Sequence, residues 1–134
     1  MAADELLASE VLHSALADSK AINREHMVQA RLMQSLSLAV RAGEGISDAL
    51  NQLSDYSRAH FLSEEVLMRL YGYADYQMHQ HDHERMIEWI DEMCARKGEH
   101  DAMAHAIQEL IAIFLRHIGS HDVYLHDFLG DLAA

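Results

Sequence analysis

Apolar residues recur every three or four positions along four stretches of the chain, which is the spacing of one face of an α-helix. No stretch alternates apolar and polar residues as a half-buried strand does. The chain has no proline. Four of its six glycines, Gly43, Gly45, Gly72 and Gly98, separate the stretches, whereas Gly119 and Gly130 lie in and after the fourth. The pattern therefore predicts four helices and no sheet.

The connections between these stretches indicate the topology. Connections of about three to seven residues place consecutive helices antiparallel to each other. Ser47 and Asp48 are suitable residues for the start of the second helix, and Gly98 is suitable for ending the third. We therefore expect an all-α fold, an antiparallel up-down-up-down four-helix bundle with a long first helix that starts near Asp4.

Polar residues interrupt the apolar face of every predicted helix. They are five histidines and two carboxylates: His26, His60, Glu64, His79, His83, His117 and Asp122. Side chains four residues apart lie on the same helix face, so each such pair can reach one point in the bundle core. A buried imidazole or carboxylate without a partner costs on the order of a few kcal/mol. One such histidine is usually just hydrogen-bonded, but seven residues at this spacing favour a shared metal site.

The number and type of these residues indicate which metal they suit. Seven protein ligands exceed the four of a tetrahedral zinc site. Two six-coordinate ions that share both carboxylates and a solvent-derived bridge leave one position open on the ion with two histidines. Imidazole and carboxylate suit iron. Glu10 and His13 form the only Glu-x-x-His pair, which disfavours a ferritin-like site. A histidine-rich site favours reversible O2 binding over oxidative catalysis.

Composition and charge exclude several classes of protein. A net charge of −12 argues against nucleic-acid binding, which needs a basic face. No apolar run approaches the roughly 20 residues of a membrane span. The acidic start of the chain does not resemble a secretory signal, and the single cysteine, Cys94, cannot form an internal disulfide. These features favour a cytoplasmic protein.

The motifs as a set resemble those of the hemerythrin family, four-helix proteins that bind O2 at a non-haem di-iron centre. The resemblance covers about residues 20 to 130 and rests on His26, on His60-Phe61-Leu62-Ser63-Glu64-Glu65, on His79-x-x-x-His83 and on His117-Ile118 through Asp122. Two features depart from the family pattern. Ile113 stands where a tryptophan is often found, and the aromatic residues that precede the first helix in stand-alone members are missing.

The resemblance implies a role for each of the seven residues. His79, His83 and His117 would bind one iron, whereas His26 and His60 would bind the iron that has an open position. Glu64 and Asp122 would bridge the two iron ions together with an oxo or hydroxo group.

The resemblance also implies a function, for which several alternatives stay open. Residues 1–134 would form a single hemerythrin-like domain, with 1–19 as an N-terminal helical arm. It would bind O2 without being an enzyme, either as a carrier or store or as an O2- or redox-sensing module of a larger signalling protein. The alternatives are a di-iron enzyme that acts on peroxide or nitric oxide, and a bundle whose histidines bind zinc or no metal.

Several residues near the seven carry separate expectations. His117 and Asp122 are five residues apart, about 140° out of phase on a regular α-helix, which predicts a π-type turn near Gly119. We expect His81 and His121 to face solvent, and His126, one turn after Asp122, to lie against the ligands. Glu65 should face outward or orient a neighbouring group. Cys94 should pack in the core as a small apolar residue.

Overall fold

The computed structural model describes residues 24–96 and 98–133, and these residues contain helices and turns but no strand. The helices are α2 (Arg24–Ala42), α3 (Ile46–Leu70), α4 (Tyr76–Ala95) and α5 (His100–His117), after which the π-helical turn η1 (Ile118–Asp122) leads into α6 (Val123–Ala133). The predicted start of the first helix and the arm of residues 1–19 lie outside the described residues. No described helix combines the length and apolar character of a membrane span.

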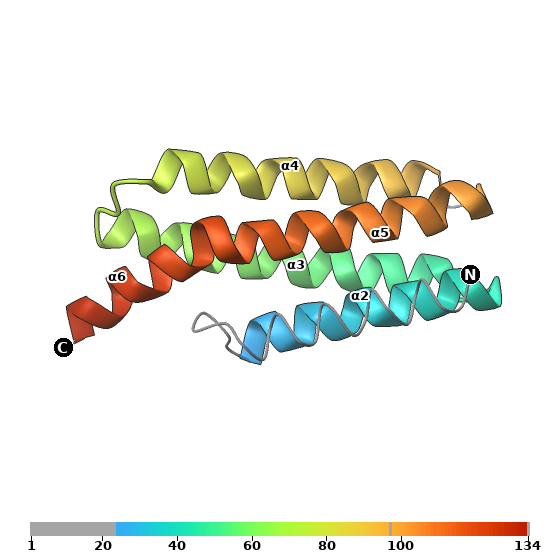
Figure 1. Ribbon diagram of the computed structural model, residues 1–134, viewed down its shortest axis with the longest axis horizontal. Helices are drawn as coiled ribbons and strands as arrows, with labels where there is room; N and C mark the ends of the chain where they lie inside the picture. Colours follow the sequence, from blue (N-terminus) through green and yellow to red (C-terminus); the bar gives the residue numbers. More distant parts are fainter. Residues whose placement is uncertain (1–23, 97, 134) are drawn as a thin grey trace.

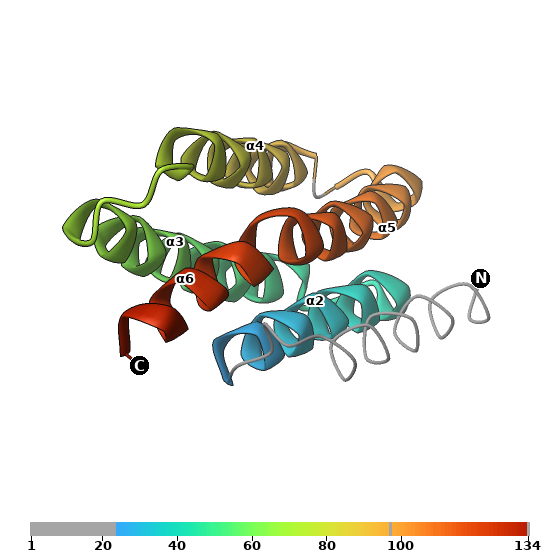
Figure 2. The same ribbon diagram turned by 60° about the vertical axis from the view of Figure 1, so that its left-hand side comes forward.

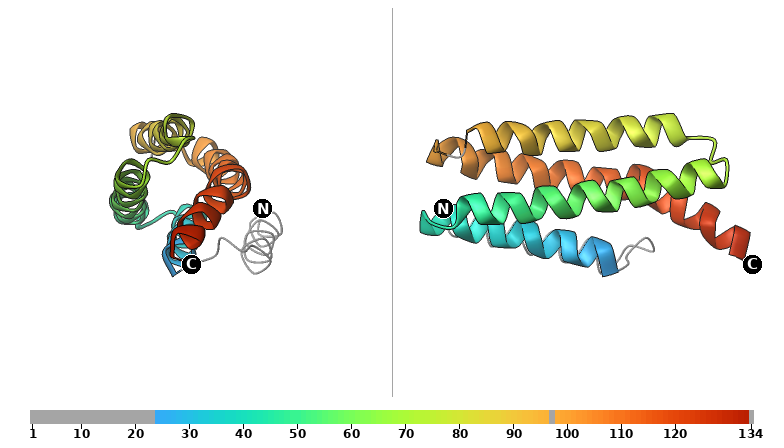
Figure 3. Two further views of the ribbon diagram at one scale, coloured as in Figure 1. Left: turned by 90° about the vertical axis from the view of Figure 1, so that its left-hand side faces the viewer. Right: turned by 180° about the vertical axis from the view of Figure 1, so that it is seen from behind.

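Four of these helices form an antiparallel bundle (Figure 1). Helix α2 packs against α3 and α5, and α4 packs against the same two helices. The view along the bundle shows the four helices around a common axis (Figure 3). Helix α6 continues the chain beyond α5 and η1, past the start of α2 (Figures 1 and 2). The predicted all-α four-helix bundle is confirmed.

Glycines in the left-handed conformation close the turns between the helices. Gly43 and Gly45 have φ angles of 75° and 76°, which residues with a Cβ rarely adopt. Gly45 also caps α3, which begins at Ile46. The expectation that Ser47 caps this helix is therefore wrong, because the left-handed glycine turns the chain into the helix before Ser47 is reached.

Apolar side chains fill the half of the bundle that lies away from α6. They come from all four helices and include Met33, Leu36, Leu53, Ile90, Leu110 and Phe114, all of them fully buried. Full burial of such a side chain is worth about 1.5–3 kcal/mol. Cys94 packs against this cluster as expected. The other half of the bundle contains the polar residues, so the apolar half holds the helices rigidly around them.

Candidate metal centre

The structure brings together all seven residues that the sequence singles out. They lie on four helices and the π turn: His26 on α2, His60 and Glu64 on α3, His79 and His83 on α4, His117 on α5, and Asp122 in η1. All seven are buried, and even the most accessible, Glu64, is only 6% exposed. A cluster of this many titratable side chains away from solvent requires that they satisfy one another or share a cation.

The two oxygens of Glu64 face different histidines. Its Oε1 lies 3.0 Å from Nε2 of His83 and 3.4 Å from Nε2 of His79, both on α4. Its Oε2 lies 3.4 Å from Nε2 of His60, one turn earlier on α3. The carboxylate therefore stands between the two groups of histidines.

Asp122 divides its oxygens in the same way. Its Oδ1 lies 2.9 Å from Nε2 of His117 and 3.0 Å from Nε2 of His79. Its Oδ2 lies 3.0 Å from Nε2 of His26 on α2. Each carboxylate thus points one oxygen at the group His79, His83 and His117 and the other at His26 or His60. This is the arrangement of a carboxylate that bridges two positive centres.

The two histidine groups differ in how tightly they are gathered. The ring centroids of His79, His83 and His117 are 4.5–4.8 Å apart. Together with Glu64 and Asp122, these residues offer five ligand atoms that all lie within 4.8 Å of one another. The rings of His26 and His60 are 5.3 Å apart and nearly perpendicular. The first group surrounds its centre more completely than the second.

The chemistry of these atoms fits a metal ion. Within the described part of the chain, Nε2 of His79, His83 and His117, both Oε atoms of Glu64 and Oδ1 of Asp122 are buried and make no hydrogen bond of acceptable geometry. Each buried polar atom left in that condition costs about 1–3 kcal/mol. Imidazole nitrogen and carboxylate oxygen are ligand atoms for iron and related metals, so cations between them would satisfy all of these atoms together.

The electrostatics of the cluster indicate the same need for positive charge. Burial alone lowers the pKa of His117, but the nearby carboxylates of Asp122 and Asp82 outweigh it and raise that pKa to about 9. Burial raises the pKa of Glu64 and Asp122, but their histidine partners outweigh this and hold both carboxyl pKa values well below the usual range. The carboxylates are therefore ionised, and in the protein alone only protonated imidazoles can balance them.

An outer set of carboxylates contacts the opposite nitrogens of three histidines. Nδ1 of His117 lies 2.6 Å from Oδ2 of Asp82, and Nδ1 of His83 lies 2.9 Å from Oε2 of Glu65. Glu25 stands more loosely, 3.3 Å from Nδ1 of His60. A carboxylate at Nδ1 selects the tautomer whose Nε2 faces inward as a ligand.

This outer set was predicted only in part. Glu65 has the orienting role that was one of its two expected roles. Sequence reasoning missed Asp82 and Glu25 because their partners lie on other helices. One feature of the sequence could have indicated them. Asp82 directly precedes His83 and Glu25 directly precedes His26, and a residue next to an inward-facing histidine can turn its side chain toward the neighbouring helix.

The predicted π-type turn near Gly119 is confirmed by η1. The wider turn brings both His117 and Asp122 inward, and both are buried. His81 is exposed, as expected. The expected exposure of His121 is wrong: the π turn carries its ring back over His117, with the two ring centroids 5.2 Å apart. His126 does lie against a ligand, because its ring stacks on that of His26 at 5.5 Å.

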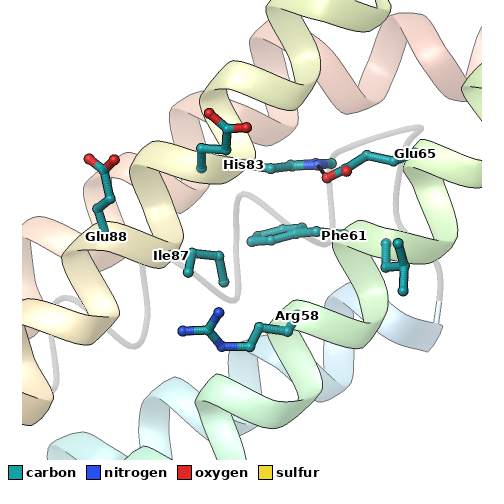
Figure 4. A pocket seen from close by; sticks show the side chains of 8 residues that line it. Arg58, Phe61, Glu65, His83, Ile87 and Glu88 are labelled. Atoms are coloured by element: carbon teal, nitrogen blue, oxygen red, sulfur yellow. Dashed lines mark hydrogen bonds and ion pairs between the residues drawn. The ribbon is translucent and has the colours of Figure 1, made fainter.

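A cavity of about 400 Å³ opens beside the cluster, between α3 and α4. Figure 4 shows the phenyl ring of Phe61 between Arg58 and the imidazole of His83, with the carboxylate of Glu65 beside that imidazole. The rings of Phe61 and His83 are nearly parallel, with centroids 4.1 Å apart. Both residues are buried, so they form the floor of the cavity and separate it from the inward-facing nitrogens.

Comparison with known proteins gives one family. The Hemerythrin HHE cation binding domain matches residues 17–129, a range that contains all seven buried ligand-type residues. Comparisons with curated proteins and with solved structures give no significant match. A match over most of the chain, together with the buried cluster of histidines and carboxylates, identifies a metal-binding domain. The chain belongs to the hemerythrin family.

Proposed function

We propose that this domain binds O2 reversibly at two non-haem iron ions. The observation that carries the proposal is the division of the carboxylate oxygens, since Glu64 and Asp122 each face both histidine groups. A single ion would be surrounded by one group of histidines, and it would not need two carboxylates placed between two such groups. Five histidines and two shared carboxylates suit a pair of ions.

The proposed ligands follow from these contacts. His79, His83 and His117 would hold one ion, and His26 with His60 the other. Glu64 and Asp122 would bridge them, together with an oxo or hydroxo group. When bound, the two ions supply the redox chemistry of O2 binding. The protein's own contribution is to hold seven ligands buried and oriented, with Asp82 and Glu65 fixing two of the imidazoles from outside.

The charge of the site supports binding over catalysis. Its five imidazoles are neutral as ligands, so the two carboxylates contribute the only negative charges among the seven protein ligands. A carboxylate-rich set would stabilise high oxidation states of iron better. All seven residues are buried, so a large substrate would have no direct access to the ions. We therefore infer a binding protein, and both a carrier or store of O2 and an O2-sensing module use the same chemistry.

The test is the iron content of the purified chain together with its visible spectrum. Two irons per chain, and an absorption band that forms when the anaerobically reduced protein meets air and disappears under argon, are the expected results. Zinc or no metal would contradict the proposal. Rapid turnover of peroxide or nitric oxide would favour the enzymatic alternative.

Two variants on the same helix sharpen this test. His79 is fully buried and contacts both carboxylates, whereas His81, two residues later on α4, is exposed. His79→Ala should lose iron and the visible band. His81→Ala should keep both, because its side chain faces solvent.

A further inference from the structure

His126 occupies a defined place beside the cluster. It lies on α6, four residues after Asp122, so both side chains project from the same side of that segment. Its side chain is only partly buried. Its ring stacks on the imidazole of His26, with centroids 5.5 Å apart and planes 28° apart. The fully buried Leu125 and the contact of Phe128 with Tyr73, 5.0 Å between ring centroids, hold this part of α6 in position.

The ligand atoms of His126, His26 and Glu64 all lie within 4.8 Å of one another. Opposite ligand atoms of one six-coordinate ion stand about 4.2 Å apart, twice a metal–nitrogen distance of about 2.1 Å. Shifts of a few tenths of an ångström would therefore let these three residues share an ion. In the other group, the ligand atoms of Glu64, Asp122 and the three histidines also lie within 4.8 Å of one another.

A count of ligands shows what His126 would add. On the proposed assignment, the ion on the His26 side has two histidines, one oxygen from each bridging carboxylate and a solvent-derived bridge. This leaves one of six positions for a small ligand. His126 approaches this ion from the His26 side and supplies a third imidazole, as the other ion already has.

His126 can leave that position by rotation of its partly buried side chain, while Leu125 and Phe128 keep α6 in place. The helix continues the chain beyond α5 and η1 (Figure 2), and it is not one of the four helices that pack around the common axis. The helices that carry the other five histidines are held by the bundle itself. His126 is thus the one of these six histidines that stands on an element outside the four-helix frame.

We infer that His126 is a third histidine ligand of the ion on the His26 side and competes there with an incoming small ligand for the last position. The inference rests on the proposed di-iron function. It makes the affinity for the small ligand depend on how often His126 is displaced. If the position is open one-tenth of the time, the apparent affinity falls about tenfold.

The test compares the iron-loaded wild type with His126→Ala and His126→Gln, using azide as the small ligand and visible absorbance to measure its Kd. We expect two irons per chain in all three proteins and a Kd for azide that is about tenfold lower in both variants. Added imidazole should compete with azide in His126→Ala, where it can enter the vacated space, and much less in the wild type. His105→Ala, at an exposed position of α5, is the matched control and should bind azide like the wild type.

Each contrary result has its own meaning. Unchanged or weaker azide binding in both variants would overturn the competition, and weaker binding would make His126 a hydrogen-bond donor to the bound anion. Loss of iron from both variants, with His105→Ala intact, would make His126 an obligatory ligand and would also overturn it. Fewer than two irons in the wild type would overturn the proposed function itself. Circular dichroism of the metal-free variants shows whether they fold.

Discussion

The contact between Asp82 and His117 gives the sharpest prediction about metal affinity. Oδ2 of Asp82 lies 2.6 Å from Nδ1 of His117, and Nε2 of the same ring lies 2.9 Å from Oδ1 of Asp122. The Asp82 carboxylate therefore fixes the ring orientation and makes its inward nitrogen a stronger ligand. Asp82→Asn keeps the size of the side chain and its carbonyl oxygen but removes the negative charge.

The expected magnitude follows from this geometry. Loss of such an outer partner usually costs 10- to 100-fold in metal affinity, or roughly 1.4–2.8 kcal/mol. The side chain of Asp82 is 22% exposed, so water screens part of its charge. The asparagine oxygen can also still accept the hydrogen bond from Nδ1. We therefore expect a loss near the lower limit, about tenfold.

The assay is anaerobic competition for iron(II) between the protein and a coloured chelator. Asp91→Asn is the matched control on the same helix, because Asp91 pairs with Arg58 at the surface and its side chain is 56% exposed. A surface pair of this kind is worth about 0–1 kcal/mol and does not touch the cluster. Iron affinity of Asp82→Asn within twofold of the wild type, or an equal loss in Asp91→Asn, would refute the reasoning.

Three other predictions concern the pH dependence, the core and the π turn. The pKa of His117 is about 9 in the fold against 6.5 ordinarily, so its stabilisation of metal-free protein is complete below about pH 6.5 and is lost toward pH 9. The loss in free energy of unfolding is about 3 kcal/mol at most. Thermal melting of the metal-free protein at a series of pH values checks it, and a melting temperature that did not fall between pH 6.5 and pH 9 would contradict it. Phe114→Ala should cost about 3–5 kcal/mol in urea unfolding because Phe114 is fully buried, whereas Leu38→Ala, at an exposed position, should cost under about 0.5 kcal/mol. Deletion of the exposed Ser120 leaves His117 and Asp122 four residues apart, a spacing that a regular α-helix places on one face. Two irons per chain should therefore remain. Loss of iron would show that the π turn itself is required.

The sequence predicted the fold and the seven candidate ligands because both depend on helical periodicity. The spacing of His60 with Glu64, and of His79 with His83, places each pair on one helix face whatever the neighbouring helices do. The five-residue spacing of His117 and Asp122 conflicts with the same rule, and this local conflict was enough to predict the π turn. The start of the second predicted helix was less accurate, since Gly45 and not Ser47 caps α3.

Contacts between helices could not be read from the chain. Asp82 meets His117 across 35 positions, and Gln29 donates to Ser57 at 3.0 Å across 28 positions deep in the bundle. Each of these contacts depends on how far one helix is rotated and shifted against another. Side-chain packing in the apolar half of the bundle determines that rotation, and periodicity in a single sequence does not describe it.

The chain by itself thus determined which side chains face inward, because a helix face is a local property of a few residues. Only the tertiary structure decided which oxygen of Glu64 and of Asp122 faces which histidine, and that His126 returns to lie over His26. The direction of α6 depends on the π turn and on the burial of Leu125. The physical reason is that these placements result from the packing of several helices together. A change in the volume of one packed residue can shift a helix, and this leaves the spacing of the ligands along the chain unaltered.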